Sequence, residues 1–562
     1  MTQSEQSNIS DYIKELHTVY SGNRSYFIQV LQLLQEKFHT LSPFIIQEAS
    51  IAFGIHPSEG DSIASFYSFL AHNKQLGKYT IRLCDTISCD MKGKDRIAKQ
   101  LENELGISFG ETTPDKMFTL EKCHCLGMCD QGPAILLNNI LIPKVRPSDI
   151  PIIIEKCLNG TIETENNSII SNVIVRGPLL LDIFSPGDVL NKIINFDTKT
   201  LLTTIEQTDL RGRGGAGFPT ALKWKMASDS NSDIKYVVCN ADEGEPGTFK
   251  DRYILHKNCH RVIEGMTIGA LCIGASKGFI YLRGEYSYLK PIIENTISER
   301  LKQNLLGANI LGKNGFEFNI EIRMGAGAYI CGEESALIES LEGKRGEPRN
   351  RPPYPVDTGY NDKPTIVNNI ETFLDVALIF EKGSDFFKKY GTSKSTGTKF
   401  FSISGDCEKE GIYELPFGIT IKELLEKIGA KDIKGVQIGG AAGICVPKSR
   451  FEDTIAYEAI PTGGSIILFG KDRDMLKTAL NFIEFFTDES CGQCTPCREG
   501  NKKLLEGLKM LEKGKCSASY LNQLIELGKT MQISSKCGLG QAAPNAFISI
   551  VTNFKNEILG RI

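Results

Sequence analysis

The sequence predicts a multidomain α/β protein with a helical region at each end. Its 562 residues exceed what one domain of about 100–200 residues needs, so three to five domains are expected. A composition of 41% hydrophobic and 23% charged residues is that of a globular protein rather than a disordered or fibrous one. In the middle of the chain, short apolar segments typical of strands alternate with segments whose apolar residues recur at helical spacing.

Residues 10–75 are expected to be helical. The clearest case is residues 26–38, where apolar side chains recur every three or four positions. An α/β segment follows, so we predict a helical region over residues 1–75 and a small α/β domain over residues 76–157. Further helices and strands of these two parts are expected at residues 44–53, 60–70 and 94–105, and at residues 79–83 and 117–120, respectively.

The polar residues 158–176 are typical of a linker. After this linker the α/β alternation resumes. It gives way to a small β-rich part with one helix, at residues 421–428, and then to a final helical section. Strands of the second α/β part are expected at residues 235–239, 278–282 and 318–323. The predicted domains after the linker are residues 177–395, 396–473 and 474–562.

Charge and composition argue against several classes of protein. A formal net charge of −4 gives no global field that would attract nucleic acid or an acidic membrane surface. The polar N-terminus has no signal-peptide pattern, and no apolar run is long enough to insert into a membrane. Clustered cysteines bind metal more often than they form disulfides in a reducing cytosol. We therefore expect a cytoplasmic protein that binds neither nucleic acid nor the membrane interior.

Four cysteines near the C-terminus form one candidate metal site. Cys491, Cys494 and Cys497 are each separated by two residues, and Cys537 follows within a Lys-Cys-Gly-Leu-Gly segment. Four thiolates are the ligand set of a 4Fe–4S cluster. Structural zinc also takes four cysteines, but zinc sites more often pair two C-x2-C knuckles. The spacing therefore favours an iron–sulfur cluster over zinc.

A second cysteine group lies near the N-terminus. Cys84 and Cys89 follow one expected strand, and Cys125 and Cys129 follow another, so the two loops can converge on one site. The spacing differs from zinc knuckles and suits a 2Fe–2S cluster. Cys123 competes with Cys125 as a ligand, and we favour Cys125 because it completes the spacing with Cys129. The intervening His124 is expected to be exposed or beside the cluster rather than bound to it.

A glycine-rich loop at residues 211–218 matches the G-x-G-x-x-G pattern literally. A Rossmann turn needs a strand directly before this motif, whereas residues 201–210 are expected to be helical. A standard dinucleotide turn is therefore not predicted. Arg213 and Lys223 nevertheless bring the positive charge that a phosphate requires, and Phe218 could stack on an aromatic ring.

An acidic segment at residues 240–251 follows an expected strand, where α/β proteins place their ligand-binding residues. Its carboxylates could bind Mg²⁺, act as a base, or accept hydrogen bonds from ribose and amide groups. We favour hydrogen-bond acceptors, because no second carboxylate pattern supports Mg²⁺. Glu333 and Glu334 stand at an expected helix start, where they could interact with the helix dipole or with a ligand.

Several motifs together resemble the NADH-binding flavoprotein of respiratory complex I. Residues 10–155 resemble the thioredoxin-like 2Fe–2S partner of that protein, here fused upstream. The fused order is most similar to the diaphorase large subunits of soluble NAD-reducing nickel–iron hydrogenases. The motifs are those at residues 210–220, 240–252, 325–337, 367–372 and 489–498.

The resemblance implies a fold and a set of roles. It implies a thioredoxin-like domain after the N-terminal helices, an atypical Rossmann-like domain for FMN and NADH, a small β-grasp-like domain and a C-terminal helical bundle with a 4Fe–4S cluster. Glu245 matches an acidic residue that disfavours a 2′-phosphate, which implies NAD rather than NADP. Arg351 and Tyr354 stand where the family commonly has lysine and phenylalanine, so the charge and the ring for nucleotide stacking are retained. The implied flavin residues are Gly212, Arg213, Gly214, Gly215, Lys223, Asn240, Asp242, Asn368 and Asn369; the implied nucleotide residues are Glu243, Glu334 and Phe218; Tyr329, Gly332 and Glu333 complete the cofactor site.

The implied reaction is hydride exchange between NAD(H) and FMN, followed by single-electron transfer through the 4Fe–4S cluster. The cofactors carry the chemistry, so no acid–base dyad is expected, although Tyr329 and Glu334 lie nearby. The 2Fe–2S cluster would be a side store or a link to a partner. The chain would belong to a hetero-oligomer with a further iron–sulfur subunit and a catalytic subunit, most simply a NiFe hydrogenase. A formate dehydrogenase, complex I and a non-redox zinc scaffold are the alternatives.

Overall fold

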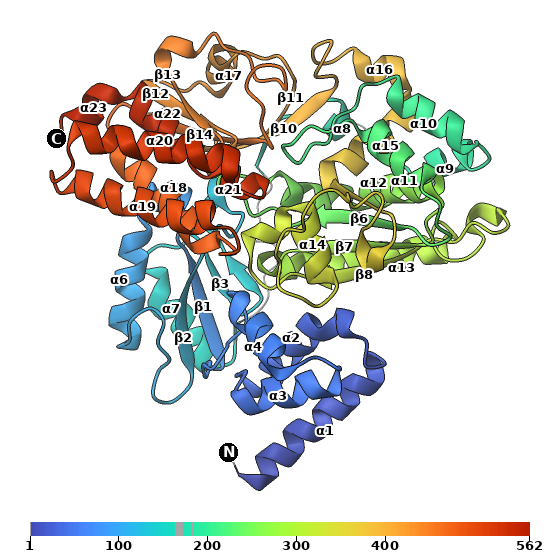
Figure 1. Cartoon of the computed structure of the whole chain (residues 1–562), viewed down its shortest axis with the longest axis horizontal. Coiled ribbons are helices and arrows are strands. Elements are labelled where there is room, and N and C mark those ends of the chain that lie inside the picture. Colours follow the sequence, from blue (N-terminus) through green and yellow to red (C-terminus); the bar gives the residue numbers. More distant parts are fainter. Residues whose placement is uncertain (1, 163–171, 182–183, 562) are drawn as a thin grey trace.

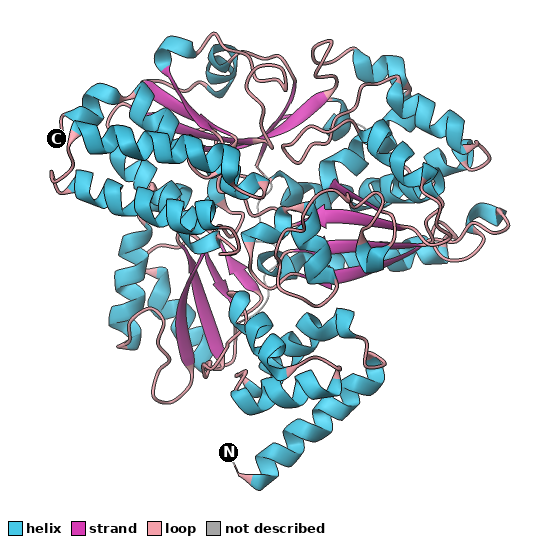
Figure 2. Ribbon diagram, in the orientation of Figure 1, coloured by secondary structure: helices cyan, strands magenta, loops and turns pink. Residues whose placement is uncertain are grey.

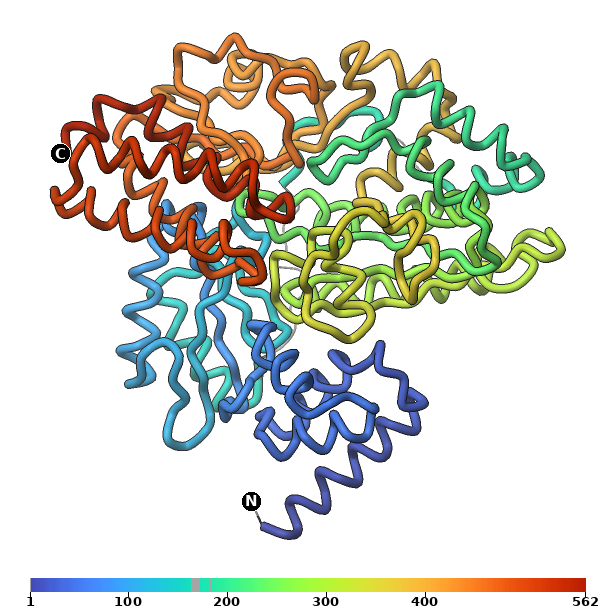
Figure 3. Tube along the Cα trace, viewed as in Figure 1, coloured from blue at the N-terminus to red at the C-terminus, as the bar shows by residue number. Residues whose placement is uncertain are grey.

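The computed structural model describes residues 2–162, 172–181 and 184–561. In Figure 1 the N-terminal helices and the small α/β domain, both blue to cyan, lie below a larger α/β domain in green and yellow. The β-rich part (orange) and the C-terminal helices (red) lie above them. Figure 2 shows three separate sheets, each flanked by helices. Figure 3 shows that the C-terminal helices lie against the small α/β domain, although hundreds of residues separate them in sequence.

The N-terminal region is helical, as expected. The first helix begins earlier than residue 10, because Thr2 and Glu5 form a capping box that satisfies its first amides. Apolar residues of the first helix, such as Ile13, pack into one core with the helices that follow. The helices are α1 (Gln3–Val19), α2 (Phe27–Phe38), α3 (Pro43–Ala52) and α4 (Pro57–Phe66).

The small α/β domain has a four-stranded sheet in the order β2-β1-β3-β4. Its first two strands are parallel and carry cysteines at their carboxyl ends, which brings the two cysteine loops to one edge. The β3–β4 hairpin was not predicted; its turn at Asn138, which has a positive φ, is the local signal. The elements are β1 (Tyr79–Cys84), α5 (Ile87–Asp90), α6 (Lys94–Leu105), β2 (Phe118–Cys123), β3 (Ile135–Leu137), β4 (Ile140–Ile142) and α7 (Asp149–Leu158).

The larger α/β domain is built on a parallel sheet in the order β8-β7-β6-β9. One face packs on α12 and α15, and the other face packs on α14 and the N-terminal helices. The three predicted strands are present as β6, β7 and β8. The strands are β6 (Tyr236–Ala241), β7 (Lys277–Leu282), β8 (Asn319–Met324) and β9 (Thr365–Asn369); the helices are α8 (Pro178–Leu181), α9 (Asp188–Ile193), α10 (Thr198–Glu206), α11 (Thr220–Asp229), α12 (Lys250–Ile273), α13 (Lys290–Lys302), α14 (Glu334–Leu341), α15 (Ile370–Lys382) and α16 (Ser384–Lys388).

This strand order creates a topological switch point. From β6 the chain adds β7 and β8 on one side and later returns to place β9 on the other side. The ends of β6 and β9 therefore stand side by side where the strand order reverses, and residues from both line a crevice at the carboxyl edge of the sheet. Ligands of open α/β sheets bind at such crevices, so the sheet itself locates the candidate site.

The β-rich part is a six-stranded sheet in the order β13-β12-β14-β10-β11-β5, with one helix at the expected residues 421–428. Its edge strand β5 (Val173–Val175) comes from the end of the segment expected to be a linker and pairs with β11. Residues 163–171 of that segment lie outside the described residues. The other elements are β10 (Thr398–Gly405), β11 (Gly411–Pro416), α17 (Ile421–Ile428), β12 (Ile433–Ile438), β13 (Ile444–Pro447) and β14 (Ser465–Gly470).

The chain ends in a bundle of helices, as expected. Its apolar faces share a core with β13 and with the larger α/β domain. Over the described residues, no helix is both long and apolar enough to cross a bilayer. The helices are α18 (Met475–Glu489), α19 (Thr495–Glu512), α20 (Ala518–Ser534), α21 (Gly538–Ala542), α22 (Asn545–Asn553) and α23 (Lys555–Leu559).

Candidate active site and metal centres

A cavity of about 1360 Å³ opens at the switch point between β6 and β9. The larger α/β domain forms its floor, and loops from the β-rich part and the C-terminal helices form its opposite wall. Three parts of the chain therefore build one site. The predicted cofactor residues that line this cavity are Gly212, Gly214, Gly215, Phe218, Lys223, Asn240, Asp242, Glu243, Glu245, Tyr329, Gly332, Glu333, Glu334, Asn368 and Asn369.

The glycine loop follows helix α10 and an irregular stretch, so it is not a Rossmann turn. The amide N–H of Gly212 donates to the carbonyl of Phe218 over 2.9 Å and closes the loop. The Tyr457 hydroxyl donates to the Gly212 carbonyl over 2.8 Å and fastens the loop to the β-rich part. Gly215 has a φ of +126°, and the nearest atom to the place of its missing Cβ is 4.0 Å away. The loop backbone is therefore open to the cavity.

Arg213 is the one predicted cofactor residue that does not line the cavity. Its guanidinium is fully buried behind the loop, where Nε lies 2.6 Å from Asp375 Oδ2 and Nη2 donates to the Thr396 carbonyl over 2.8 Å. Its amide N–H donates to the Thr372 hydroxyl. This geometry therefore does not support the expectation that the Arg213 side chain holds the flavin. The ion pair with the buried Asp375 keeps the side chain on the side of the loop that faces away from the cavity.

Three asparagines stand where β6 and β9 end. Asn240 Nδ2 donates to the Gly332 carbonyl over 2.9 Å and ties β6 to the turn before α14. Asn369 caps helix α15 through its side-chain oxygen. Asn368 accepts a hydrogen bond from the indole of Trp224 over 2.9 Å, which fixes its oxygen and directs its amide donor away from the indole. Asn368 is thus oriented by a residue that sequence reasoning missed.

The acidic residues of the cavity act as separate hydrogen-bond acceptors. Glu243 accepts from the Asp251 amide over 2.9 Å and from the Tyr286 hydroxyl over 2.9 Å. Glu245 accepts from the Tyr329 hydroxyl and from the Ala442 amide. Burial raises the pKa of Glu243 and of Glu245 to about 7 in each case. This arrangement agrees with the expected acceptors rather than with a shared Mg²⁺ ion.

Charged side chains at the cavity rim hold one another in place. Lys223 Nζ donates to Glu334 Oε2 over 2.8 Å and to the Val367 carbonyl over 3.1 Å. One oxygen of Glu333 accepts from the amides that begin α14, so Glu333 is the N-cap of that helix. The rings of Phe218 and Tyr354 are 45% and 47% exposed and stand at the mouth of the cavity.

The cavity fits a flavin nucleotide on two observations. Its glycine loop leaves room that a Cβ would fill, and exposed backbone at such a loop suits a phosphate. Three buried polar atoms of residues that line it have no hydrogen-bond partner among the described residues: Asp242 Oδ2, Thr248 Oγ1 and Glu333 Oε1. Buried polar groups normally have hydrogen-bond partners, so these atoms indicate a polar ligand. Thr248 and the buried Lys250, which also lines the cavity, were not predicted.

The first cysteine group is gathered beside the larger α/β domain. Cys84, Cys89, Cys125 and Cys129 are all buried. The Sγ atoms of Cys125 and Cys129 lie 3.5 Å apart. A hydrogen bond from Cys89 lowers the pKa of Cys84 to about 6, which favours the thiolate that a metal binds.

The structure distinguishes Cys123 from Cys125. Cys123 ends β2, and its thiol donates to the Leu83 carbonyl of the neighbouring strand over 3.7 Å. Cys125 instead lies against Cys129. This geometry supports the preference for Cys125 as a ligand.

The second cysteine group joins three helices. Cys497 lies in the first turn of α19, and Cys537 caps α21. Ser490 Oγ and Asn501 Nδ2 lie 3.3 and 3.4 Å from the Cys497 sulfur. Helix N-termini and such donors favour an anionic cluster. Over the described part of the chain, no group of three or more His, Cys, Asp and Glu side chains is arranged to hold a single metal ion.

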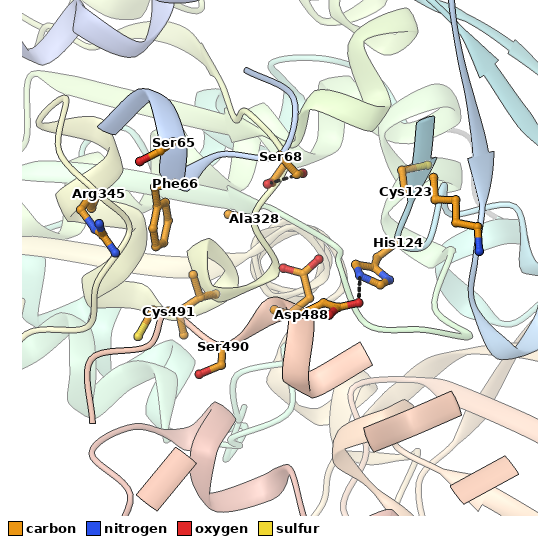
Figure 4. A pocket seen from close by; sticks show the side chains of 14 residues that line it. Ser65, Phe66, Ser68, Cys123, His124, Ala328, Arg345, Asp488, Ser490 and Cys491 are labelled. Atoms are coloured by element: carbon orange, nitrogen blue, oxygen red, sulfur yellow. Dashed lines mark hydrogen bonds and ion pairs between the residues drawn. The ribbon is translucent and has the colours of Figure 1, made fainter. Parts of the chain in front are cut away.

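A second cavity, of about 320 Å³, lies where the N-terminal helices, the small α/β domain and α18 meet. Figure 4 shows His124 and Asp488 facing each other in it; His124 Nε2 lies 3.5 Å from Asp488 Oδ2. The His124 ring also packs edge-on against Phe485. His124 therefore contacts α18, as suits a residue beside a cluster. Cys123 and Cys491 line the same cavity, so the two cysteine regions share a boundary.

Three family models match the chain in succession. Residues 13–158 match a thioredoxin-like 2Fe-2S ferredoxin, residues 205–378 match the Nuo51 FMN-binding domain, and residues 477–561 match the iron-sulfur binding region of NADH-ubiquinone oxidoreductase F. These matches define the class: an NADH-linked oxidoreductase subunit with FMN, a 2Fe–2S cluster and a 4Fe–4S cluster. They leave no support for a non-redox zinc scaffold.

Individual relatives show which members of this class the chain is similar to. The alpha subunit of the NAD-reducing hydrogenase HoxS of Cupriavidus necator is 40% identical over 555 residues, which cover 95% of this chain and 92% of that subunit. The NADP-reducing hydrogenase subunit HndC of Solidesulfovibrio fructosivorans is 42% identical over 379 residues, 66% of this chain and 77% of that subunit. A crystal structure of an NAD⁺-reducing NiFe-hydrogenase in the H2-reduced state contains a chain that matches with a TM-score of 0.90 and 34% identity, covering 96% of this chain and 93% of that one. The chain therefore belongs to the family of the NAD-reducing hydrogenase alpha subunit, as the sequence motifs predicted.

Proposed function

We propose that the large cavity binds FMN and NAD(H), and that the chain exchanges a hydride between them and relays electrons singly between this site and a partner. The observation that carries the proposal is that every predicted cofactor residue except Arg213 lines this one cavity. FMN, when bound, accepts a hydride and gives up electrons one at a time, which links a two-electron nucleotide to one-electron clusters.

The glycine loop and the residues around it would hold the flavin nucleotide. The open backbone at Gly214 and Gly215 can approach a phosphate closely, and Lys223 adds positive charge at the rim. Asn368 would offer an amide donor that Trp224 keeps in one orientation. Asp242, with one unpartnered oxygen, would supply an acceptor.

The nicotinamide nucleotide would enter at the mouth, between the rings of Phe218 and Tyr354. Glu243 and Glu245 would accept hydrogen bonds from it. A carboxylate at Glu245 repels the two negative charges of a 2′-phosphate, which supports NAD over NADP as the substrate. Tyr329 holds this carboxylate through its hydroxyl group.

Two cysteine sets would hold the clusters. Tyr329, which lines the cavity, contacts α18, the helix that leads to Cys491. Its amide donates to Glu489 Oε2 over 2.8 Å, and its ring packs against Phe485. This contact supports electron exit through the 4Fe–4S cluster. The proposed ligands are Cys491, Cys494, Cys497 and Cys537 for the 4Fe–4S cluster and Cys84, Cys89, Cys125 and Cys129 for the 2Fe–2S cluster.

We further propose that the partner is a NiFe hydrogenase catalytic subunit, reached through an additional iron–sulfur subunit in a cytoplasmic hetero-oligomer. The support is the near full-length likeness to a subunit of an NAD-reducing hydrogenase. Co-purification tests the proposal: NAD⁺ should be reduced by H2 with the complex that travels with this chain. Reduction by formate and not by H2 would replace the hydrogenase with a formate dehydrogenase.

The cavity assignment has its own test on the anaerobically purified protein. Gly214→Val would place a branched side chain in the cavity and should abolish flavin retention and NADH-dependent dye reduction. Gly560→Val, at the exposed end of the last helix, is the matched control and should retain both. Full flavin content in Gly214→Val would show that the flavin binds elsewhere.

A further inference from the structure

The carbonyls of two proposed 2Fe–2S ligands each accept a hydrogen bond from a cation. Arg283 Nη2 donates to the Cys125 carbonyl over 2.7 Å, and Lys92 Nζ donates to the Cys129 carbonyl over 2.9 Å. Neither cation was singled out by its position in the sequence, because both stand far along the chain from the cysteine they contact. The two cations therefore place positive charge beside each cysteine of the second pair.

Arg283 is the more deeply placed of the two. Its side chain is 4% exposed, whereas that of Lys92 is 20% exposed and pairs with Glu410. Arg283 also pairs with Glu285 over 2.8 Å, and its Nη1 donates to the carbonyl of Glu243, a residue that lines the large cavity. One guanidinium thus contacts both the cysteine loop and the cavity wall.

The cysteine loop lies directly on this wall. Gly127, between Cys125 and Cys129, has a φ of +67°, and a Cβ there would fall 2.1 Å from the Tyr286 hydroxyl. That hydroxyl donates to Glu243 Oε2 over 2.9 Å. A second buried arginine, Arg252, pairs with Asp130 at the end of the same loop over 3.0 Å. The cysteine loop is therefore held against the cavity wall by close packing at Gly127 and by the ion pair between Asp130 and Arg252.

We propose that Arg283 is a positioning residue that raises the reduction potential of the 2Fe–2S cluster, and that Lys92 does so more weakly. The proposal rests on the proposed ligand set, Cys84, Cys89, Cys125 and Cys129. Their four thiols are buried, and the Sγ atoms of Cys125 and Cys129 lie 3.5 Å apart, which fits such a cluster. The electron comes from NADH oxidation, and the step adds one electron to the cluster without making or breaking a bond.

The physical cause is charge. Reduction adds one negative charge at a site from which water is largely excluded, and a buried positive charge beside a ligand favours the reduced state. Removing Arg283 removes that charge and leaves Glu285 unpaired beside the same loop, so both changes disfavour reduction. Water screens Lys92 more than Arg283, so its removal should matter less.

The test is a redox titration of the purified holoprotein, followed by the EPR signal of its reduced 2Fe–2S cluster. Arg283→Gln should lower the equilibrium constant for reduction at least tenfold, which is about 59 mV toward negative potential for a one-electron couple. Lys92→Gln should shift it in the same direction by less. Arg283→Lys, which keeps the charge, should stay close to the wild type.

Arg323→Gln is the matched control. Arg323 is also a buried arginine, but it pairs with Glu321 and contacts the N-terminal helices, so its loss should leave the potential unchanged. An unchanged potential in both Arg283→Gln and Lys92→Gln would overturn the inference. Equal shifts in Arg283→Gln and Arg283→Lys would also overturn it, because shape and not charge would then be responsible. If Arg283→Gln fails to assemble its cluster, the reduction potential of Lys92→Gln alone decides whether the inference holds. Absence of the signal from the wild type would instead refute the proposed ligands.

Discussion

The buried pair between Arg213 and Asp375 allows the sharpest test of how the glycine loop is held. Both side chains are fully buried, and Nε lies 2.6 Å from Oδ2. We consider Asp375→Asn, which keeps the shape of the side chain and removes its charge. Among the described residues, Arg213 then has no partner of opposite charge in direct contact, while the loop that it anchors still faces the cavity.

The magnitude follows from the distance and the burial. Unit charges 2.6 Å apart attract by about 6 kcal/mol at an effective dielectric constant of about 20, before any desolvation cost is subtracted. Measured losses on removing one partner of a buried pair are about 3–5 kcal/mol. We expect a decrease of that size in the free energy of unfolding, together with loss of flavin from the loop. Thermal melting and flavin content of the purified protein measure the two effects.

A double variant separates anchoring from ligand binding. In Arg213→Met with Asp375→Leu, both charges are gone, and the methionine can fill the space between the Phe387 and Phe417 rings that now flank the guanidinium. Most of the stability and the flavin content should return, because apolar replacements of buried pairs are often neutral. If the double variant is stable and still lacks flavin, Arg213 contacts the flavin directly and our account of this loop is refuted.

Three further changes test other parts of the site. Trp224→Phe leaves the Asn368 oxygen unsatisfied at a cost of about 1–3 kcal/mol and should raise the FMN dissociation constant about 5–150-fold; an unchanged constant by fluorescence titration would contradict this. The folded protein holds the proton of Glu245 more tightly than the unfolded chain, with a pKa of about 7 against 4.5, so the stability from this group is full below pH 4.5 and declines as pH rises through 7. Glu245→Gln should therefore gain melting temperature relative to the wild type between about pH 5 and pH 8, and a pH-independent difference would argue against the raised pKa. Gly265→Ala would put a Cβ 2.0 Å from the Phe373 carbonyl oxygen and force α12 and α15 apart. It should lower the free energy of unfolding by about 1–3 kcal/mol or more, and a wild-type melting temperature would contradict this packing.

The order of elements could be predicted because it depends on local patterns. Helices α6 (Lys94–Leu105) and α17 (Ile421–Ile428) fall where their apolar periodicity placed them. The short strand β5 (Val173–Val175) could not be found in this way. Three residues are too few to show the alternating pattern of a strand. Their pairing with β11 also depends on a part of the chain more than two hundred residues away.

The candidate site was predictable where a motif carries its own chemistry, as the spaced cysteines and the glycine loop do. It was not predictable where the fold supplies the partner. Arg213 carries the charge expected of a phosphate contact, yet Asp375 draws it behind the loop. Trp224 reaches the site through Asn368, and Arg283 reaches it through Cys125 and Glu243. These are all tertiary contacts, so no local signal in the sequence marks either residue.

We propose that NADH and a flavin share one cavity, and that electrons pass from it to two clusters held by the same chain. Rapid mixing of the anaerobic protein with NADH, followed by flavin absorbance and by EPR of frozen samples, tests it most directly. We predict that flavin absorbance is lost first, that the cluster signals follow, and that protein stripped of flavin shows neither. Cluster reduction by NADH in the flavin-free protein would contradict the account.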